Sequence, residues 1–250
     1  MLASLQFDGP WQGTSTSWFV GSVDATGTRF EAEQQGLLDY GQLYAGKSGT
    51  TLAAAPGDRR VLFAFTGYPS PTLPTVCASL PGAYHGMYHV FPRILTLGAD
   101  SRLALAPVAE LETLRAKTQA ANVSVTNASA TTGAVLATGS QLDVAVRCSF
   151  EAKGEEGEGR RSGAPTEGQL ALSVLGDTAG AELLLVGYDF AQQLLFVDHA
   201  QIGNATIQQT APLPRDRLRL GGEGGEGGEG PVFLRIVLDN AMVESFCRFD

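Results

Sequence analysis

The sequence predicts an all-β protein, and three observations support this fold class. Most apolar residues fall in short segments rich in Val, Leu and Phe, bounded by Gly, Pro, Asp or Asn. Residues 142–150 alternate in character, with the two-residue period of a strand that has one buried face. Only residues 107–117 suit a helix, because Val108, Leu111 and Leu114 fall on one side and a proline can begin the first turn.

The predicted strands follow one another along the whole chain. Residues 39–49 and 58–67 are expected to form an antiparallel pair, joined by a turn in which Pro56 and Gly57 supply the bend. In chain order, the apolar segments that predict strands are residues 15–24, 59–67, 87–97, 102–108, 141–150, 169–176, 181–190, 193–200 and 232–239.

The composition changes near residues 107–118, where we place a boundary. Aromatic-rich strands precede this segment, and a second set of alternating strands follows it. Two glycine-rich acidic stretches, residues 153–165 and 221–230, interrupt the second set. They cannot bury enough apolar surface to order themselves, so we expect solvated loops between strands.

Composition and charge narrow the class of protein. The 250 residues are 44% apolar and 17% charged, which predicts a globular chain despite the formal net charge of -9. The excess of acidic residues disfavours a nucleic-acid partner, since binding phosphates needs clustered Lys and Arg. No apolar run approaches the roughly 18 residues needed to span a bilayer, so no membrane partner is expected.

The cysteines and asparagines indicate in which cellular compartment the protein is expected. Cys77, Cys148 and Cys247 are far apart and odd in number, which favours buried free thiols over a zinc site or a disulfide framework. Three of the four asparagines begin an N-x-[ST] acceptor triplet, which points to a secretory or vacuolar history although the N-terminus carries no signal peptide: Asn122, Asn127 and Asn204.

Residues 41–48 fit the phosphate-loop spacing G-x-x-x-x-G-K-[ST]. A phosphate loop works by following a buried strand and opening a helix whose N-terminal amides hold the anion. Here Gly49, Thr50 and Thr51 are poor helix formers, and Pro56 stops any helix that has begun. The context therefore favours an accidental match inside a pair of strands, with an NTPase kept as a minor alternative.

Four segments in order resemble glycoside hydrolase family 32, the invertases, inulinases and other β-fructofuranosidases. They are "WFVGSVD"; "LLDYGQLYAGKSG" with the following "RRVLFAFTG"; "YHGMYHVFPRILTLGADSRLALAPVAELETLR", which includes a Pro-Arg pair at Pro92 and Arg93; and "RIVLDNAMVESF". The resemblance implies the last blades of a five-bladed β-propeller in residues 1–106, a linker at 107–118 and a C-terminal β-sandwich in 119–250.

The resemblance also implies the chemistry: hydrolysis of terminal fructose from sucrose or fructans by a retaining glycosidase, which uses two carboxyl groups. The family's nucleophile and acid/base motifs, of Asn-Asp-Pro-Asn-Gly and Glu-Cys type, precede its Asp-Tyr-Gly element. Only 38 residues precede Asp39 here, and none of these motifs occurs among them. We therefore expect no catalytic residue in this chain, which would be an inactive C-terminal fragment, by gene-model truncation or gene decay.

The substrate-binding residues implied by the resemblance are Asp39, Tyr44 and Phe65. Asp39 would bind the sugar beyond the fructose, although Gln42 stands where the family often has a Lys to hold this Asp by charge. Tyr44 would line the fructose site. An equally weighted alternative is that its ring only packs against neighbouring side chains of the sheet. Phe65 stands where the family normally has a Trp. Its ring could still stack on a sugar face, but it lacks the hydrogen-bond donor of the indole N–H. No cofactor and no metal are expected.

The sequence is also compatible with a function that involves no catalysis. The β-sandwich could act without catalysis, by binding carbohydrate or by pairing with another subunit, because sandwich faces and open strand edges suit such contacts. Titration with fructose, sucrose and inulin would separate the binding version from the others.

Overall fold

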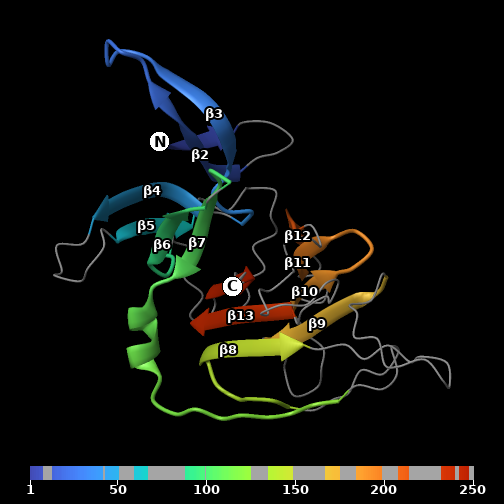
Figure 1. Ribbon diagram of the computed structural model, residues 1–250. Coiled ribbons are helices and arrows are strands. Elements are labelled where there is room, and N and C mark those ends of the chain that lie inside the picture. Colours follow the sequence, from blue (N-terminus) through green and yellow to red (C-terminus); the bar gives the residue numbers. More distant parts are fainter. Residues whose placement is uncertain are drawn as a thin grey trace, which may run out of the picture. The chain divides into compact units, whose positions relative to one another are not determined.

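The structure, a computed structural model, is built almost wholly of antiparallel strands, which confirms the all-β prediction (Figure 1). The chain divides into two compact units, residues 1–112 with 200–209 and residues 113–199 with 210–250. The residues that the structure describes are 1–7, 13–41, 43–50, 59–66, 88–98, 100–124, 135–148, 167–174, 184–198, 208–213, 232–239 and 242–247.

The first unit contains two antiparallel sheets, each a meander in which neighbouring strands follow one another in sequence. The three-stranded sheet has the order β1-β2-β3 and consists of Leu2–Phe7, Gly13–Val23 and Phe30–Leu37. The four-stranded sheet has the order β4-β5-β6-β7 and consists of Leu43–Thr50, Arg60–Thr66, Arg93–Leu97 and Leu103–Pro107.

The first unit is held together by an apolar core on one face of the four-stranded sheet. Leu62 and Ala64 of β5 are buried there, since residues two apart on a strand share a face. The other buried members are Leu38, Leu43 and Val90, and partly buried residues packed against them include Leu2 and Trp18 from the three-stranded sheet. Fully burying such side chains contributes about 1.5–3 kcal/mol each, so this cluster fixes the face that the sheet turns inward.

The expected helix at 107–117 is shorter and tighter than predicted. The chain forms a 3₁₀ helix, η2, over Ala109–Leu114, and no residue of η2 is buried. Without a buried face, packing cannot stabilise a longer α-helix, because most helical stability in proteins comes from packing one apolar side. Val108, just before η2, is the buried anchor of this segment. Within the described ranges, no helix has the length and apolar content needed to cross a membrane.

The second unit also contains two antiparallel sheets. The three-stranded sheet has the order β14-β13-β8 and consists of Met242–Cys247, Val232–Asp239 and Gln141–Cys148. The four-stranded sheet has the order β12-β11-β10-β9 and consists of Gln208–Pro212, Leu194–Asp198, Leu184–Asp189 and Gln169–Val174.

Strand β8 confirms the strand that the alternating pattern of residues 142–150 predicts. It pairs with β13 over its whole length, from Gln141 opposite Asp239 to Cys148 opposite Val232. Cys148 is a free, half-buried thiol, and burial raises its pKa. The free-thiol prediction is confirmed for this residue; Cys77 and the side chain of Cys247 lie outside what the structure describes.

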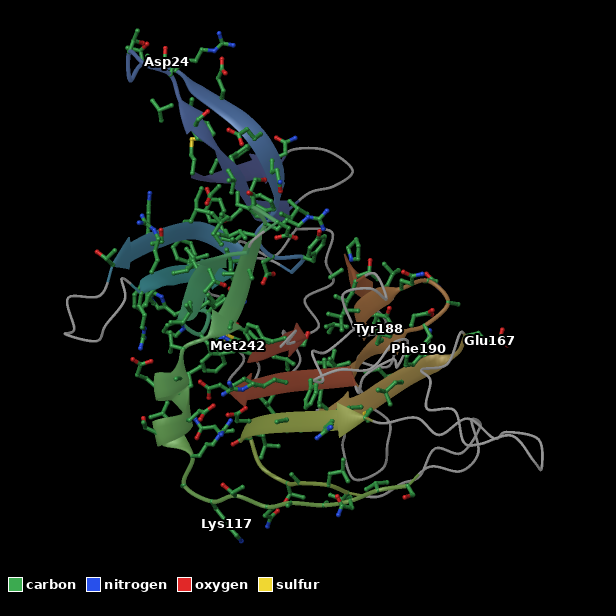
Figure 2. All side chains as sticks on the ribbon, viewed as in Figure 1. Asp24, Lys117, Glu167, Tyr188, Phe190 and Met242 are labelled. Atoms are coloured by element: carbon green, nitrogen blue, oxygen red, sulfur yellow. The ribbon has the colours of Figure 1, made fainter. Side chains whose placement is uncertain are left out.

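Aromatic packing closes one end of the β9–β12 sheet. Tyr188 and Phe190, labelled in Figure 2, are buried and meet edge to face with ring centroids 5.0 Å apart. The Tyr188 hydroxyl donates a hydrogen bond of 2.8 Å to the carbonyl oxygen of Leu213, which joins the same cluster. The phenol is therefore both packed and satisfied, as a buried tyrosine must be.

A charged cluster ties the segment after η2 to the β8–β13 pair. Arg235 of β13 binds Asp143 of β8 with two hydrogen bonds of 2.8 Å, one to each carboxylate oxygen. Arg115 donates a third, of 2.7 Å, to Oδ2. Although burial by itself raises the pKa of Asp143, the hydrogen bonds and charges of the two guanidinium groups outweigh it, and the pKa lies below its ordinary value.

This cluster predicts acid sensitivity. A carboxyl group whose pKa is depressed by folding stabilises the fold above its unfolded pKa, and that stabilisation is lost as the pH falls through the folded pKa. We expect Asp143→Asn to lower the free energy of unfolding by about 1–3 kcal/mol at pH 7. In urea unfolding followed from pH 7 to pH 2, this difference should shrink below the ordinary pKa of 3.8. A difference that stays constant across that range would contradict the role given to the carboxylate charge.

Candidate functional site

The candidate site lies at the end of the four-stranded sheet where β4 begins and β5 ends. Strands β4 and β5 pair antiparallel, from Leu43 opposite Thr66 to Thr50 opposite Arg60. This confirms the strand pair predicted from residues 39–49 and 58–67; the turn between the two strands lies outside the described residues. The three residues predicted to bind substrate all fall at this end: Asp39 precedes β4, Tyr44 is its second residue, and Phe65 is the penultimate residue of β5.

The phosphate-loop match is accidental, as its context predicted. Lys47 and Ser48 lie inside β4, opposite Phe63 and Leu62, and begin no helix. The Ser48 hydroxyl accepts a hydrogen bond of 3.0 Å from Nε of Arg60. A serine that is paired along a strand cannot take part in the cradle of backbone amides that surrounds a phosphate.

A β-bulge near the start of β4 changes the direction in which its side chains point. Tyr44 stands opposite Phe65 and Lys47 opposite Phe63, so two residues, Ala45 and Gly46, face a single residue of β5. Ala45 has φ of 51°, in the left-handed region that favours glycine. This is the geometry of a bulge whose first residue is normally Gly, and such bulges turn side chains at the edges of sites. The bulge is what places Tyr44 across from Phe65.

The strain at Ala45 can be tested directly. Replacing Ala45 by Gly should stabilise the protein by about 0.5–1 kcal/mol, because relief of the left-handed conformation outweighs the extra backbone entropy that Gly loses on folding. The measurement is the midpoint of urea unfolding. Ala104→Gly is the matched control, since Ala104 is an exposed residue of β7 in the same sheet, without a positive φ, and should lose stability. Equal shifts in the two variants would argue against stored strain.

Asp39 is fixed by two hydrogen bonds, one to each carboxylate oxygen. Oδ1 accepts the backbone N–H of Gly41 at 2.6 Å, and Oδ2 accepts NH1 of Arg93 at 2.5 Å. The Arg93 side chain is only 6% exposed and that of Asp39 20%. Arg93 is the first residue of β6 and stands opposite Leu62, so it extends from the face that carries the apolar core. A nearly buried guanidinium thus neutralises a carboxylate at the edge of that core.

Arg93 is the residue of the candidate site that the sequence did not predict. The sequence suggested only that Gln42, in place of a Lys, leaves Asp39 without a cationic partner. The structure shows that β6, 54 residues further along the chain, supplies one. The available signal was the Pro92-Arg93 pair quoted for the family resemblance, but nothing in its spacing indicated which acid it meets. Gln42 lies outside the described residues.

An aromatic group lies on the opposite face of the same sheet. The rings of Tyr44 and Phe65 meet edge to face with centroids 5.8 Å apart. His89 forms an isolated bridge with Phe65, and their rings also meet edge to face at 6.5 Å. Phe65 stands three residues from Leu62, so by strand alternation it lies on the other face from the core. Beside it on that face, Phe63 is an exposed large hydrophobic residue.

The structure therefore brings the predicted residues together at one sheet end but on two faces. Asp39 pairs with Arg93 on the core face, and Tyr44 packs against Phe65 on the other. Among the described side chains, no set of three or more His, Cys, Asp or Glu residues is placed to hold a metal ion.

Comparison with known proteins gives one family and a consistent fold. The family description "Glycosyl hydrolases family 32 C terminal" matches residues 110–248. No curated protein matches the chain. Solved structures do, at identities that show the fold alone, and the chain spans about half the length of each of them.

Three of these structures illustrate the likeness. The exo-inulinase from Aspergillus awamori has a TM-score of 0.59 at 20% identity, over 99% of this chain and 45% of that one. The fructosyltransferase from A. japonicus has a TM-score of 0.57 at 16% identity, over 98% and 46%. The β-fructofuranosidase from Schwanniomyces occidentalis, complexed with fructosyl-erythritol, has a TM-score of 0.53 at 12% identity, over 98% and 47%.

Proposed function

The chain belongs to glycosyl hydrolase family 32, and from this premise we propose that it forms the C-terminal part of a β-fructofuranosidase-like enzyme that removes terminal fructose from sucrose or fructans. The family match covers more than half of the chain and carries the proposal. The similar solved structures support a fructosyl sugar as ligand, since they are named as an inulinase, a fructosyltransferase and a β-fructofuranosidase. In this view residues 1–106 contribute propeller blades, 107–118 the linker and 119–250 the β-sandwich.

We assign Asp39 a role in binding rather than in proton transfer or nucleophilic attack. Both of its oxygens already accept a hydrogen bond, from Gly41 and Arg93. A carboxylate oxygen offers about two acceptor positions, so each oxygen can still accept one sugar hydroxyl. Its charged partner is a guanidinium group, whereas catalysis by a retaining glycosidase needs a second carboxyl group across the scissile bond. Tyr44 and Phe65 would supply the apolar surface on which a sugar ring stacks.

Hydrolysis needs more than this chain provides. A retaining glycosidase places its two carboxyl groups about 5–5.5 Å apart, on either side of the scissile bond. The neighbour of Asp39 is instead a cation, and the family's nucleophile and acid/base motifs are absent from the sequence. We expect the 250-residue chain by itself to bind fructosyl sugars without turning them over.

Two measurements on the purified chain test this proposal. Incubation with sucrose and inulin should release no fructose, and calorimetric titration with the same sugars should give saturable binding. Asp39→Ala and Tyr44→Ala should each weaken binding about tenfold, which corresponds to about 1.4 kcal/mol. Glu33→Ala, which removes an exposed carboxylate on β3 of the same unit, is the matched control and should leave affinity unchanged.

The outcomes test the role assigned to Asp39 and the position of the sugar site. Fructose release by the chain alone would refute the assignment of Asp39 as a binding residue without a catalytic partner. Binding that survives both Asp39→Ala and Tyr44→Ala would move the sugar site elsewhere, and a chain that binds none of these sugars would refute the site altogether. Binding without turnover that survives Asp39→Ala would instead fit the alternative function, a non-catalytic protein that binds carbohydrate through its β-sandwich.

A further inference from the structure

We propose that Asn122 is an N-glycosylation site, which takes an oligosaccharide from a lipid-linked donor during passage through a secretory compartment. Asn122, Val123 and Ser124 form an N-x-[ST] triplet whose middle residue is not proline. The sequence contains two further triplets of this kind, at Asn127 and Asn204, and sequence alone does not distinguish the three. Asn127 and Asn204 lie outside the described residues, whereas the structure describes the setting of Asn122.

The triplet lies in an exposed, extended segment. After η2 ends at Leu114, residues 115–124 form no helix, strand or turn, and every one of them is exposed. Even the apolar Val123 is 47% exposed. In Figure 1 this segment continues from η2 as an extended ribbon, and the side chain of Lys117, labelled in Figure 2, points away from it into open space.

The exposed segment, residues 115–124, is anchored at its beginning by Arg115, and Asn122 lies further along it. Arg115 binds Asp143 with its Nε–H at 2.7 Å, which holds the beginning of the segment against the sheet of the second unit. Asn122 follows seven residues later, so an extended chain can carry it as much as roughly 23–25 Å from that anchor. The acceptor thus belongs to a folded unit and yet remains reachable, which is the setting of a glycosylated surface loop.

Accessible, unpaired backbone is what the reaction needs. The side-chain amide of Asn122 and the hydroxyl of Ser124 must enter the transferase together, and a segment without ladder hydrogen bonds permits this both before and after the chain has folded. Residues 115–124 form no such ladder. A glycan here also costs no buried contact, because its attachment point and both neighbours are already in water.

In the proposed reaction, the oligosaccharide is transferred from a lipid pyrophosphate to the side chain of Asn122. The amide nitrogen Nδ2 of Asn122 forms a bond to the anomeric carbon of the first sugar, and the bond from that carbon to the lipid pyrophosphate oxygen breaks. The amide nitrogen loses one proton to a base of the transferase, and the lipid pyrophosphate leaves with the bonding electron pair. No oxidant or metal-bound group of this chain takes part.

The test uses the full 250-residue chain behind a cleavable secretion leader, translated with microsomes. In a variant with Asn127→Gln and Asn204→Gln, which keeps Asn122 alone, the membrane-protected product should carry one glycan that endoglycosidase removes. Adding Asn122→Gln should abolish this mass increment. Adding Ser124→Ala should abolish it as well, while Ser124→Thr should retain it.

Each result decides the proposal, and none depends on complete folding, because translocated chains are analysed whether or not they are exported. A protease-protected single-acceptor product without a glycan would overturn it. So would a glycan that persists after Ser124→Ala, since the attachment would then not depend on the triplet. Mass spectrometry of the released peptide should place the increment on Asn122, and its placement on any other residue would also reject the site.

Discussion

Replacing Gly187 by Ala should cost the second unit about 2–4 kcal/mol of unfolding free energy. Gly187 lies in the middle of β10, opposite Ala171 of β9 and Phe196 of β11. A Cβ atom at this position would meet the carbonyl oxygen of Leu170 at 2.1 Å and the Cα of Ala171 at 2.8 Å. These are backbone atoms, which cannot rotate away as a side chain does, so the β9–β10 pairing has to shift.

Gly49→Ala is the matched control for this substitution. Gly49 is also a strand glycine without a positive φ, but a Cβ there would have nothing within 4 Å. It should be neutral or stabilising by up to about 1 kcal/mol, because Ala loses less backbone entropy than Gly on folding. Urea unfolding of both variants measures the contrast. Equal midpoints for Gly187→Ala and the unsubstituted chain would show that β9 and β10 are further apart than the structure has them.

Strands with an apolar pattern could be predicted from sequence, and strands of mainly polar sequence could not. Strand β13 buries Leu234, Ile236 and Leu238, and β8 half-buries Val144 and Val146; the apolar segments 232–239 and 141–150 predicted these two strands. Strand β3, with the sequence FEAEQQGL, is almost wholly exposed and was not predicted. It forms because its backbone pairs with β2, and backbone pairing leaves no apolar pattern in the sequence. Strand β12, with the sequence QQTAP, was missed for the same reason.

The candidate site, too, could be predicted from the sequence only in part. The positions of Asp39, Tyr44 and Phe65 at one sheet end follow from the strand pair that the sequence predicted. The partner of Asp39 does not, because an ion pair between β6 and the segment before β4 depends on the tertiary fold and not on spacing. The bulge at Ala45 was equally hidden, since the left-handed residue is an alanine and the glycine follows it. Only Gly, Asn or Asp at that position would have marked it.

Removing the guanidinium of Arg93 should have an effect comparable to that of Gly187→Ala, and it tests the candidate site. Breaking an ion pair with a buried member leaves the other charge poorly solvated, at a cost of about 3–5 kcal/mol when both are fully buried. Arg93 is 5% exposed, whereas the Asp39 side chain retains 20%. We therefore expect Arg93→Met to lose about 2–4 kcal/mol in urea unfolding.

A double-mutant cycle isolates the pair from the packing of the arginine stem. Arg93→Met and Asp39→Asn should be non-additive by about 1–3 kcal/mol, because each removes the same charge-assisted hydrogen bond. Arg102→Met is the surface control in the same hairpin. Arg102 contacts Asp100 at 3.8 Å with its side chain 61% exposed, and an ion pair of this kind contributes about 0–1 kcal/mol. Additive losses at Arg93 and Asp39 would show that the pair contributes no coupling.

Arg93→Lys separates stability from sugar recognition in the same experiment. Lysine keeps the positive charge but offers a point charge in place of the planar donor fork, so it neutralises Asp39 without fixing the orientation of its oxygens. If Asp39 binds a sugar hydroxyl, affinity for fructosyl sugars should fall by more than the loss of stability explains, since recognition depends on where the acceptors point. If Asp39 serves only the fold, affinity should be unchanged once the protein is folded. Arg93 would then be a structural residue, and the sugar would have to be recognised from the aromatic face of Tyr44 and Phe65 alone.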